Sequence, residues 1–472
     1  MRAGYESAKT GSENQNHWSA ADDLGPVSAH TASVRGTLRK RCRYERDNNP
    51  HLCGLLKTYA HNLVGTGPRL NIQLGTQFHE SAREVEKDFA AWAKAVDLAD
   101  KLRLMAETRP VDGESFGRLV TNPLNPHPVK LNLRVYEAEQ IATPDLRTQF
   151  DTSLTDGIEF DANGNPRVYH VLKEHPGDAW SFYGDAERVE ARFMLHWFRP
   201  SRPGQTRGVC ELAASLGIGA QTRRFSQAVL TKAEANANVS GVMKTNVPLM
   251  DSDNQPVELK MMDDIEFPRG TMLTIPEGFD ATKFDNGSDT TGFGEYVAVQ
   301  YTTLGRPLLM PRNLVTGDSS GFNFASGKLD YLPFYQEMWI ERDRLAARVL
   351  NQLFQAYYLE ASLRGLIPED LPAINEWSWD WHWDGFPSIN PEKDEAAREM
   401  RLANNVTTLA EECAGEGKNW RDVIDQRAIE REYMRAKGMD PDAAMKPKAA
   451  TQPAPADASV DPAAATASEA AA

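Results

Sequence analysis

The segment Gly157-Ile158-Glu159-Phe160-Asp161-Ala162-Asn163-Gly164-Asn165-Pro166 lies in the middle of the chain and has the residue pattern of two strands joined by a turn. Ile158 and Phe160 alternate on the arm before the turn, and Val168 and His170 alternate on the arm after it. The dipeptide Asn163-Gly164 supplies the positive φ that a tight turn needs. The pattern predicts a β-hairpin over residues 157–171. A hairpin by itself indicates no function.

Several short motifs surround this hairpin in a definite order. Those before it are Arg41, Arg43 and Arg46 ahead of Asn48-Asn49-Pro50, then Asn62-Leu63-Val64-Gly65-Thr66-Gly67, Val111-Asp112-Gly113-Glu114 and Glu137-Ala138-Glu139-Gln140-Ile141. Those from its second arm onward are Tyr169-His170, His175-Pro176-Gly177-Asp178, Arg202-Pro203-Gly204-Gln205-Thr206-Arg207-Gly208 and Asn390-Pro391-Glu392-Lys393-Asp394-Glu395. From composition alone, residues 202–208 are predicted to form a solvated loop, because Pro203-Gly204 is a turn signal. Each segment is short enough to occur by chance, but their order and spacing together are specific.

Taken together, these motifs resemble those of the lambda-type tailed-phage portal proteins, from about residue 39 to about residue 438. The chain departs from the family pattern at residues 323–328, where relatives tend to carry paired serines and an arginine. The resemblance implies an α+β portal fold that assembles as a cyclic ring, with twelve subunits. It divides the chain into a mixed α/β wing (36–207), a first stem helix (208–240), a clip (241–292), a second stem segment (293–312), a tunnel loop (313–327) and wing and crown helices (328–440). Composition predicts a flexible N-terminal segment (1–35) and a disordered Ala/Pro-rich tail (441–472).

Hydrophobic periodicity predicts helices on either side of a region rich in strands. The predicted elements are a helix over 82–100, strands over about 111–199, a long helix over 212–240 that ends at Gly241, short strands over 241–292, a short helix near 293–304, a flexible loop over 314–328 and a long helix over 334–366. The second half of the 212–240 helix carries small residues such as Ala233, Ala235 and Ala237. That composition suits a slim helix packed side by side with copies of itself.

Length and charge limit the possible functions. At 472 residues the chain exceeds the size at which single cores stop growing, so two or more structural regions are expected. Its 52 basic and 67 acidic residues give a net charge of −15. Tight groove-type DNA binding needs clustered lysine and arginine, so DNA that touches this protein should slide rather than stick. Net acidity also favours solubility, independently of any DNA.

The cysteine content indicates a reducing compartment, because the four cysteines are too few and too widely spaced to form a disulfide framework. They are Cys42, Cys53, Cys210 and Cys413. Cys42 and Cys53 lie near two histidines, His51 and His61, but the spacing lacks the close Cys-x-x-Cys pair of structural zinc sites. We therefore expect no metal there. The sequence has no apolar run of membrane-spanning length and no leader pattern, which predicts a cytoplasmic protein until assembly.

One pattern matches an enzyme motif. The segment Gly113-Glu114-Ser115-Phe116-Gly117 fits the G-x-S-x-G nucleophile elbow, but the alternating residues that follow predict a strand where the elbow needs a helix. No Walker A motif occurs, since Gly415-Glu416-Gly417-Lys418-Asn419 lacks the upstream glycine and the Ser/Thr after lysine. We expect no catalytic residue and no cofactor, so energy for DNA movement must come from a partner.

Two further patterns leave alternatives open. Trp377, Trp379, Trp381 and Trp383 alternate with polar residues, which favours a buried sheet face or a subunit contact. The same stretch could instead form an aromatic platform, or a metal site at Asp380, His382 and Asp384. Arg35, Arg39 and Arg43 fall near one helical face, where salt bridges or a solvated face compete with a contact to DNA.

The best candidates for contact with channel DNA are in or next to the tunnel loop, namely Ser319, Ser320, Asn323 and Lys328. They offer polar partners to phosphates without forming a cluster of basic residues. The resemblance implies a portal ring at one capsid vertex, through which viral DNA is packaged and ejected. It also implies as partners the terminase large subunit, capsid and scaffold proteins, the head–tail connector and double-stranded DNA. Two alternatives remain, namely a serine hydrolase centred on Ser115 and a non-portal head or neck protein.

Overall fold

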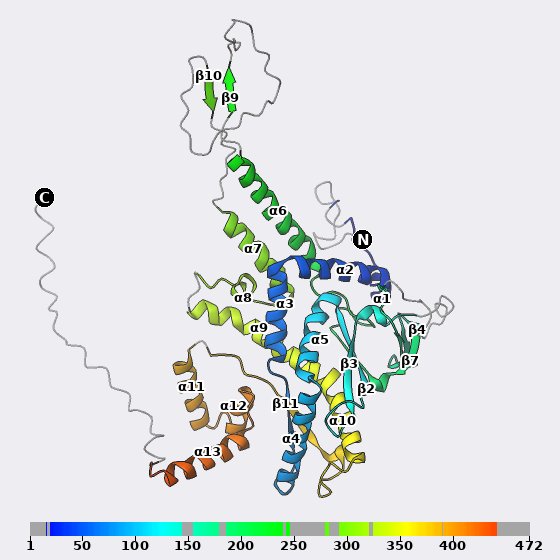
Figure 1. The fold of residues 1–472 in the computed structure, drawn as a ribbon, viewed down its shortest axis with the longest axis vertical. Helices are drawn as coiled ribbons and strands as arrows, with labels where there is room; N and C mark the ends of the chain where they lie inside the picture. Colours follow the sequence, from blue (N-terminus) through cyan, green and yellow to red (C-terminus); the bar gives the residue numbers. More distant parts are fainter. Residues whose placement is uncertain are drawn as a thin grey trace, which may run out of the picture. The chain divides into compact units, whose positions relative to one another are not determined.

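The computed structural model describes residues 16, 19–143, 154–178, 186–238, 242–245, 279–282, 292–320, 324–388 and 390–440. Contacts divide the chain into two units, Met1–Gly417 and Lys418–Ala472. The first unit contains every strand that the structure describes and all the helices except the last (Figure 1).

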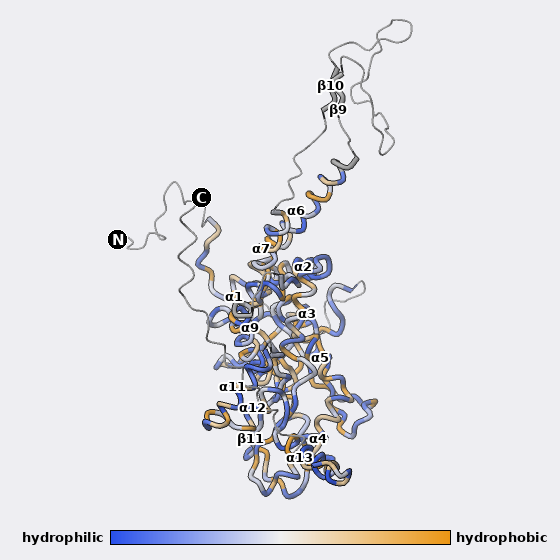
Figure 2. Tube along the Cα trace, turned by 90° about the vertical axis from the view of Figure 1, so that its left-hand side faces the viewer, coloured by the Kyte–Doolittle hydropathy of each residue, from blue (hydrophilic) through white to orange (hydrophobic). Residues whose placement is uncertain are grey.

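The central helix of the first unit is α3 (Pro50–Val64). Asn49 caps its start, because the Asn49 side-chain oxygen accepts a hydrogen bond from the backbone nitrogen of His51 at 3.1 Å. Its buried residues pack against neighbouring helices, namely α2 (Ala32–Asn48), α5 (Leu98–Asp112), α8 (Arg312–Thr316) and α9 (Phe324–Leu345). Each fully buried leucine or tyrosine of this helix contributes about 1.5–3 kcal/mol to folding. Figure 2 shows the mixture of apolar and polar residues in this body.

The predicted helix over 82–100 is two helices, α4 (His79–Ala95) and α5. Asp97 between them adopts a left-handed conformation with φ 52°, which ends one helix and redirects the chain into the next. The periodicity was continuous across the break because Val85, Phe89 and Trp92 of α4 face the same core as Leu98 of α5.

Two antiparallel sheets form the strand-rich region. One has the order β3-β2-β8, from Leu131–Tyr136, Glu114–Thr121 and Met194–Phe198. The other has the order β4-β5-β6-β7, from Leu154–Thr155, Ile158–Phe160, Pro166–Leu172 and Ala186–Glu190. Antiparallel sheets beside separate helices confirm the α+β fold class.

The predicted hairpin is formed by β5 and β6. Gly164 has φ 81° at its turn, and the Asp161 carboxylate accepts hydrogen bonds from the backbone nitrogens of Asn163 and Asn165, both at 2.8 Å. Ile158 pairs with Tyr169, and the register shifts by a bulge between Glu159 and Phe160. The prediction from Asn163-Gly164 is confirmed.

An antiparallel pair of helices, α6 (Ala213–Asn238) and α7 (Phe293–Gly305), projects from the body (Figures 1 and 2). The two predicted helices are confirmed within a few residues. At the far end lies a two-stranded sheet of β9 (Val242–Thr245) and β10 (Phe279–Thr282). The other residues of the predicted clip, 246–278 and 283–291, and Gly241 lie outside the described residues.

The predicted loop over 314–328 and the helix after it have different bounds in the structure. Helix α8 ends at Thr316 before Gly317, which has φ 70°. Helix α9 begins at Phe324, ten residues before the predicted start. Pro333 lies inside the helix and does not mark its beginning. A π-helical turn (Ala346–Leu350) then joins α9 to α10 (Asn351–Leu363), so the predicted long helix is interrupted once.

The tryptophan stripe forms β11 (Ser378–His382), which pairs with β1 (Arg69–Gln73). Trp377, Trp381 and Trp383 are buried and Trp379 is half-buried in the main core, which confirms a buried sheet face. The indole nitrogens of Trp379 and Trp381 both donate to the Asn351 side-chain oxygen, at 3.1 and 2.9 Å.

The remaining elements are short or lie near the ends of the chain. Helix α2 starts at Ala32 with Thr31 as its cap, so order begins before residue 35. The motif at Asn390 starts a helix as expected, since the Asn390 side chain accepts from the backbone nitrogen of Lys393 at 3.2 Å. The other elements are α1 (Pro26–Ala29), α11 (Pro391–Ala403), α12 (Leu409–Gly415) and the 3₁₀ helices Thr76–Phe78, Ala138–Gln140, Ala191–Phe193, Arg306–Leu308 and Ile374–Glu376.

The second unit contains α13 (Trp420–Ala436), which Asn419 caps by accepting from the backbone nitrogen of Arg421 at 3.0 Å. The predicted tail over 441–472 lies outside the described residues. Within the described ranges, every helix is too short or too polar to cross a membrane.

Candidate functional site: a buried arginine–glutamate network

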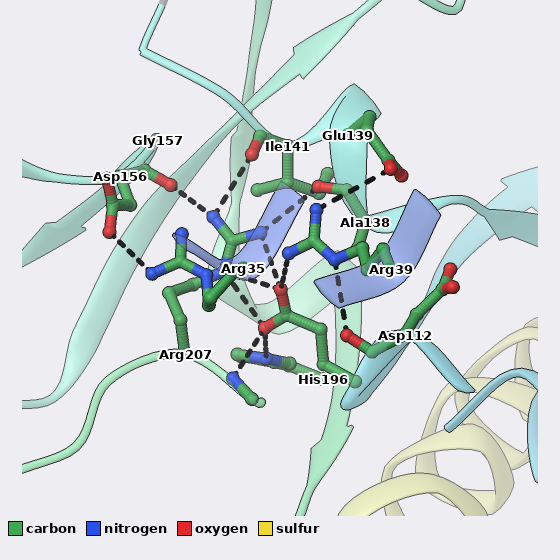
Figure 3. Close-up of polar contacts among 12 residues, drawn as sticks. Arg35, Arg39, Asp112, Ala138, Glu139, Ile141, Asp156, Gly157, His196 and Arg207 are labelled. Atoms are coloured by element: carbon green, nitrogen blue, oxygen red, sulfur yellow. Dashed lines mark hydrogen bonds and ion pairs between the residues drawn. The ribbon is translucent and has the colours of Figure 1, made fainter. Parts of the chain in front are cut away.

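Glu114 is the centre of a buried network of charges, and Figure 3 labels its partners Arg39, His196 and Arg207. It is the first residue of β2, it follows the α5 cap Gly113, and it is 0% exposed. Its carboxylate accepts hydrogen bonds from Arg207 at 2.8 to 3.0 Å and from Arg39 at 3.0 Å. The His196 ring nitrogen Nε2 and the backbone nitrogen of Gly208 complete the set, at 3.1 and 2.9 Å. Every lone pair of this carboxylate therefore has a donor.

Arg207 connects the two sheets. Besides Glu114, its guanidinium donates to the backbone oxygens of Ala138 at 3.1 Å, Ile141 at 3.0 Å and Asp156. These oxygens belong to the 3₁₀ helix after β3 and to the turn before β5. All five N–H groups of Arg207 thus have acceptors, and its guanidinium also lies over the Phe116 ring at 5.2 Å. The composition-based interpretation of residues 202–208 as a solvated loop is wrong for Arg207, which is 2% exposed.

Helix α2 supplies three arginines at four-residue spacing. Arg35 donates to Asp156 at 2.9 Å, and Arg39 donates to the backbone oxygen of Asp112 at 3.2 Å. Arg43 forms ion pairs with the carboxylates of Asp112, Glu137 and Glu139. The salt-bridge alternative for these three arginines is confirmed, and their contacts fix α2 against both sheets.

Electrostatics keep this network ionised around a neutral histidine. Burial would raise the pKa of Glu114, but the charge of Arg207 and hydrogen bonds from His196 and Arg207 outweigh it and hold that pKa well below its usual range. Burial lowers the pKa of His196, more than Glu114 raises it. A neutral ring fits both contacts, since Nε2–H donates to Glu114 and Nδ1 accepts from the Tyr169 hydroxyl at 3.4 Å.

Two motif glycines are required where the backbones meet beside Glu114. A Cβ at Gly208 would lie 2.0 Å from the backbone oxygen of Gly113. A Cβ at Gly113, which has φ 89°, would lie 2.2 Å from the carbonyl carbon of Val209. Both distances are far below contact, so these positions admit only glycine without backbone movement. Residues from three separate motifs, 111–114, 137–141 and 202–208, therefore meet at one structural site.

A second buried cluster lies at the base of α6. Arg109 is 0% exposed, and its Nη1 lies 2.9 Å from the Glu341 carboxylate and 3.0 Å from that of Glu211. Its guanidinium lies over the Trp197 ring at 4.8 Å. Because Glu211 precedes α6 and Glu341 lies on α9, this cluster joins the projecting helices to the body. The sequence motifs gave no signal for it.

The tunnel-loop candidates are not gathered into one site. Ser319 and Ser320 are exposed, and Ser320 donates through its backbone nitrogen and hydroxyl to the Asp318 carboxylate, at 2.8 and 2.9 Å. Lys328 lies on α9, where its amine forms an ion pair with Asp394 at 3.1 Å. Asn323 lies outside the described residues.

Ser115 does not occupy a nucleophile elbow. It is 0% exposed and follows a helix and a turn, whereas the elbow requires a strand before the nucleophile and a helix after it. In the register of the sheet it pairs with Trp197, and its hydroxyl has no hydrogen-bond partner among the described residues. A general base is therefore missing from its surroundings.

The metal alternatives from the sequence are not assembled either. Cys42 contacts the buried Cys210, whose hydrogen bond, together with burial, raises the pKa of Cys42, while His51 stacks on Tyr301 at 3.8 Å. Asp384 accepts from Thr66 and Arg69. Within the described ranges, one group of possible ligands gathers, Glu137, Glu139 and His175, and Arg43 already forms ion pairs with both of its carboxylates.

Comparison with known proteins agrees with the sequence motifs. Residues 14–342 match the family described as phage portal protein, lambda family. The chain is 22% identical over 445 residues to a probable portal protein of Halomonas phage phiHAP-1, covering 87% of this chain and 83% of the relative. Among solved structures, it is similar to a chain of the virion of a native gene transfer agent particle, with a TM-score of 0.47, 15% identity and coverage of 84% of this chain and 97% of the other. It is also similar to a chain of the neck of an empty particle of this kind, with a TM-score of 0.49, 14% identity and coverage of 81% and 93%.

The family match spans well over half of the chain and includes Arg39, Glu114, Arg207 and both motif glycines. This protein belongs to the lambda family of phage portal proteins.

Proposed function

We propose that this chain is the subunit of a closed ring of twelve copies at one vertex of the capsid, through which viral DNA is packaged and later ejected. The observation that carries the proposal is the family match over residues 14–342. In this proposal, residues 36–207 form the wing, and the buried network makes the wing rigid enough to bear the load of packaging. The protein is then located at the portal vertex of the virion, and in the host cytoplasm during assembly.

The helices α6 and α7 are assigned to the stem of the ring, and residues 241–292 to the clip. The sequence lacks a Walker A motif, so a partner must supply the energy for DNA movement. We assign that role to the terminase large subunit, which would dock on the clip. Capsid and scaffold proteins would contact the outside of the ring, and the head–tail connector would replace the terminase after packaging.

The portal family is structural, and this proposal includes no enzymatic activity. The burial of Ser115 supports this, because a substrate has no access to its hydroxyl. An esterase assay on the purified ring tests the point, and Ser115→Ala should leave any background hydrolysis unchanged. Turnover that disappears in Ser115→Ala while the fold is retained would revive the hydrolase alternative.

For channel DNA we retain Ser319, Ser320, Asn323 and Lys328 as contacts. The first two are exposed on the α8–α9 connection, and the neighbouring Asp318 is acidic, which agrees with DNA that slides without tight binding. Lys328 would have to leave its ion pair with Asp394 to meet a phosphate. Ser319→Lys with Ser320→Lys should retard DNA and reduce packaging, whereas Ser362→Lys, at an exposed position on α10, should not.

The test of the proposed function is complementation of a phage genome from which this gene is deleted. Particles are purified after expression of the wild-type chain in trans, and nuclease-protected DNA is measured. Restoration of filled heads by the wild-type chain is the expected result. Filled heads in the absence of this chain would contradict the proposal.

A further inference from the structure

Helix α9 is apolar on two sides. Its inner side carries Phe334, Met338 and Leu345, all of which are fully buried in the core. The outer side carries four large apolar residues that remain exposed, namely Leu329 at 66%, Leu332 at 53%, Trp339 at 45% and Ile340 at 43%. Their spacing of three, seven and one residues places them on one stripe of the helix. We call these four residues, with the bordering acids Asp330 and Asp343, the α9 face.

A helix that is apolar on opposite sides is normally covered on both. Single exposed apolar residues are common on protein surfaces, whereas four along one stripe of a helix are typical of an interaction site. The α9 face also has unused charge. Asp330 and Asp343 are exposed and form no ion pair in the part of the chain that the structure describes, whereas the nearby cations Lys328 and Arg344 are paired with Asp394 and Glu341.

A complementary surface lies elsewhere on the same chain. Arg223 of α6 pairs with Glu45 of α2 at 2.9 Å and lies over the Tyr44 ring at 5.2 Å, which joins the two helices side by side. Beside this contact are four exposed residues, one aromatic and three basic, that we call the α2–α6 face: Lys40, Arg41, Tyr44 and Arg224. Its three cations form no ion pair with any described residue.

We propose that the α9 face of one subunit packs against the α2–α6 face of the next copy of this chain. The apolar stripe would cover Tyr44, and the acids Asp330 and Asp343 would meet the basic residues, as complementary interfaces require. Helices α9 and α2 occupy different parts of the body (Figure 1), so each copy offers one face of each kind. Such a head-to-tail contact generates a closed ring when the rotation from one copy to the next is a whole fraction of a turn, as in the ring proposed above. The inference rests on the ring of the proposed function and identifies the surface that forms it.

Charge inversion of each face tests the proposal. One variant combines Asp330→Lys with Asp343→Lys, which makes both faces basic. The other combines Lys40→Glu with Arg41→Glu, which shifts the α2–α6 face toward acidic. Each variant alone should need at least about tenfold more protein to assemble than the wild type, because like charges meet at every contact. Arg167→Glu, at an exposed position in the hairpin, is the control and should assemble normally.

Mixing the two inverted variants gives the decisive result. In an alternating ring, the basic α9 face of one variant meets the acidic α2–α6 face of the other at half of the contacts. At the remaining contacts, the acidic α9 face of the second variant meets the basic α2–α6 face of the first. Rings that contain equal numbers of the two chains are therefore expected in the mixture by native mass spectrometry, although each variant alone stays dissociated. This recovery also shows that both variants are folded.

The apolar contribution has its own test. Trp339→Ser with Ile340→Ser should weaken assembly, whereas Leu124→Ser, at a position that is 90% exposed, should not. Wild-type rings together with normal assembly of each inverted variant would overturn the inference and leave the proposed function intact. Folded variants that fail to recover on mixing would also overturn it. A wild-type chain that never forms a ring would instead contradict the proposed function itself.

Discussion

Arg342 of α9 donates from Nε to the backbone oxygen of Leu63 at the end of α3, at 3.0 Å. Its Nη2 donates to the backbone oxygens of Asn62 and Asp384, each at 2.9 Å. The last carbonyls of a helix lack partners within the helix and carry the negative end of its dipole, so a cation is favoured there. Burial lowers the pKa of Arg342 to about 10, against the opposing effect of Asp384, and the side chain still carries its charge at neutral pH.

Arg342→Met should therefore destabilise the fold by about 3 kcal/mol, since the apolar stem is kept but one buried and two partly buried carbonyl oxygens lose their donor. Equilibrium unfolding in urea measures the change. Arg364→Met, which removes an exposed pair with Glu360 on α10, serves as the control and should cost less than about 0.5 kcal/mol. Equal effects of the two substitutions would show that the helix cap contributes nothing.

Glu114→Gln should destabilise the protein by about 3–5 kcal/mol, because Arg39 and Arg207 would remain buried without their shared carboxylate. The glutamine has nearly the same shape, so the loss reports charge rather than volume. The control is Glu187→Gln, which breaks the half-exposed pair with Arg118 and should cost about 0–1 kcal/mol. A loss below 1 kcal/mol in Glu114→Gln would refute a stabilising role for the network.

The same network predicts a pH dependence. The pKa values of His196 and Glu114 are both lowered by folding, so the unfolded chain binds these protons more readily and stability falls as pH falls. The loss should begin near pH 6.5 for His196 and near pH 4.5 for Glu114, the ordinary values of these groups, with a slope of up to about 1.4 kcal/mol per pH unit for each. Unfolding free energies measured from pH 8 to pH 4 test this. In His196→Gln, the loss of unfolding free energy that begins near pH 6.5 should be absent. If this variant shows the same pH dependence as the wild type, another group causes that loss.

Asn351→Ala should cost about 1–3 kcal/mol for each indole N–H that it orphans, since Trp379 and Trp381 share the Asn351 oxygen. The same change should alter tryptophan fluorescence, and Asn351→Asp, which keeps the acceptor, should alter it less. If both variants unfold with the wild-type free energy, this contact does not hold the π-helical turn against β11.

The sequence predicted local elements where one residue type imposes a geometry. Asn163-Gly164 fixed the hairpin turn, and Asn390 marked the start of a helix. It did not reveal the break at Asp97, because the residues on both sides face the same core, nor the early start of α9, because Pro333 suggests a boundary that the helix tolerates. Glu114 belongs to a recognisable sequence motif, but its role depends on Arg207, 93 residues away. No local sequence pattern predicts a contact over that separation. The cluster of Arg109 with Glu211 and Glu341 could not be predicted from the sequence for the same reason.

Native mass spectrometry of the purified protein, combined with negative-stain imaging, shows whether the chain closes into a ring. The expected result is a particle with a central hole and a mass of about 630 kDa, twelve copies of the 52.5 kDa chain under cyclic symmetry. A compact monomer or dimer under every salt condition would contradict it.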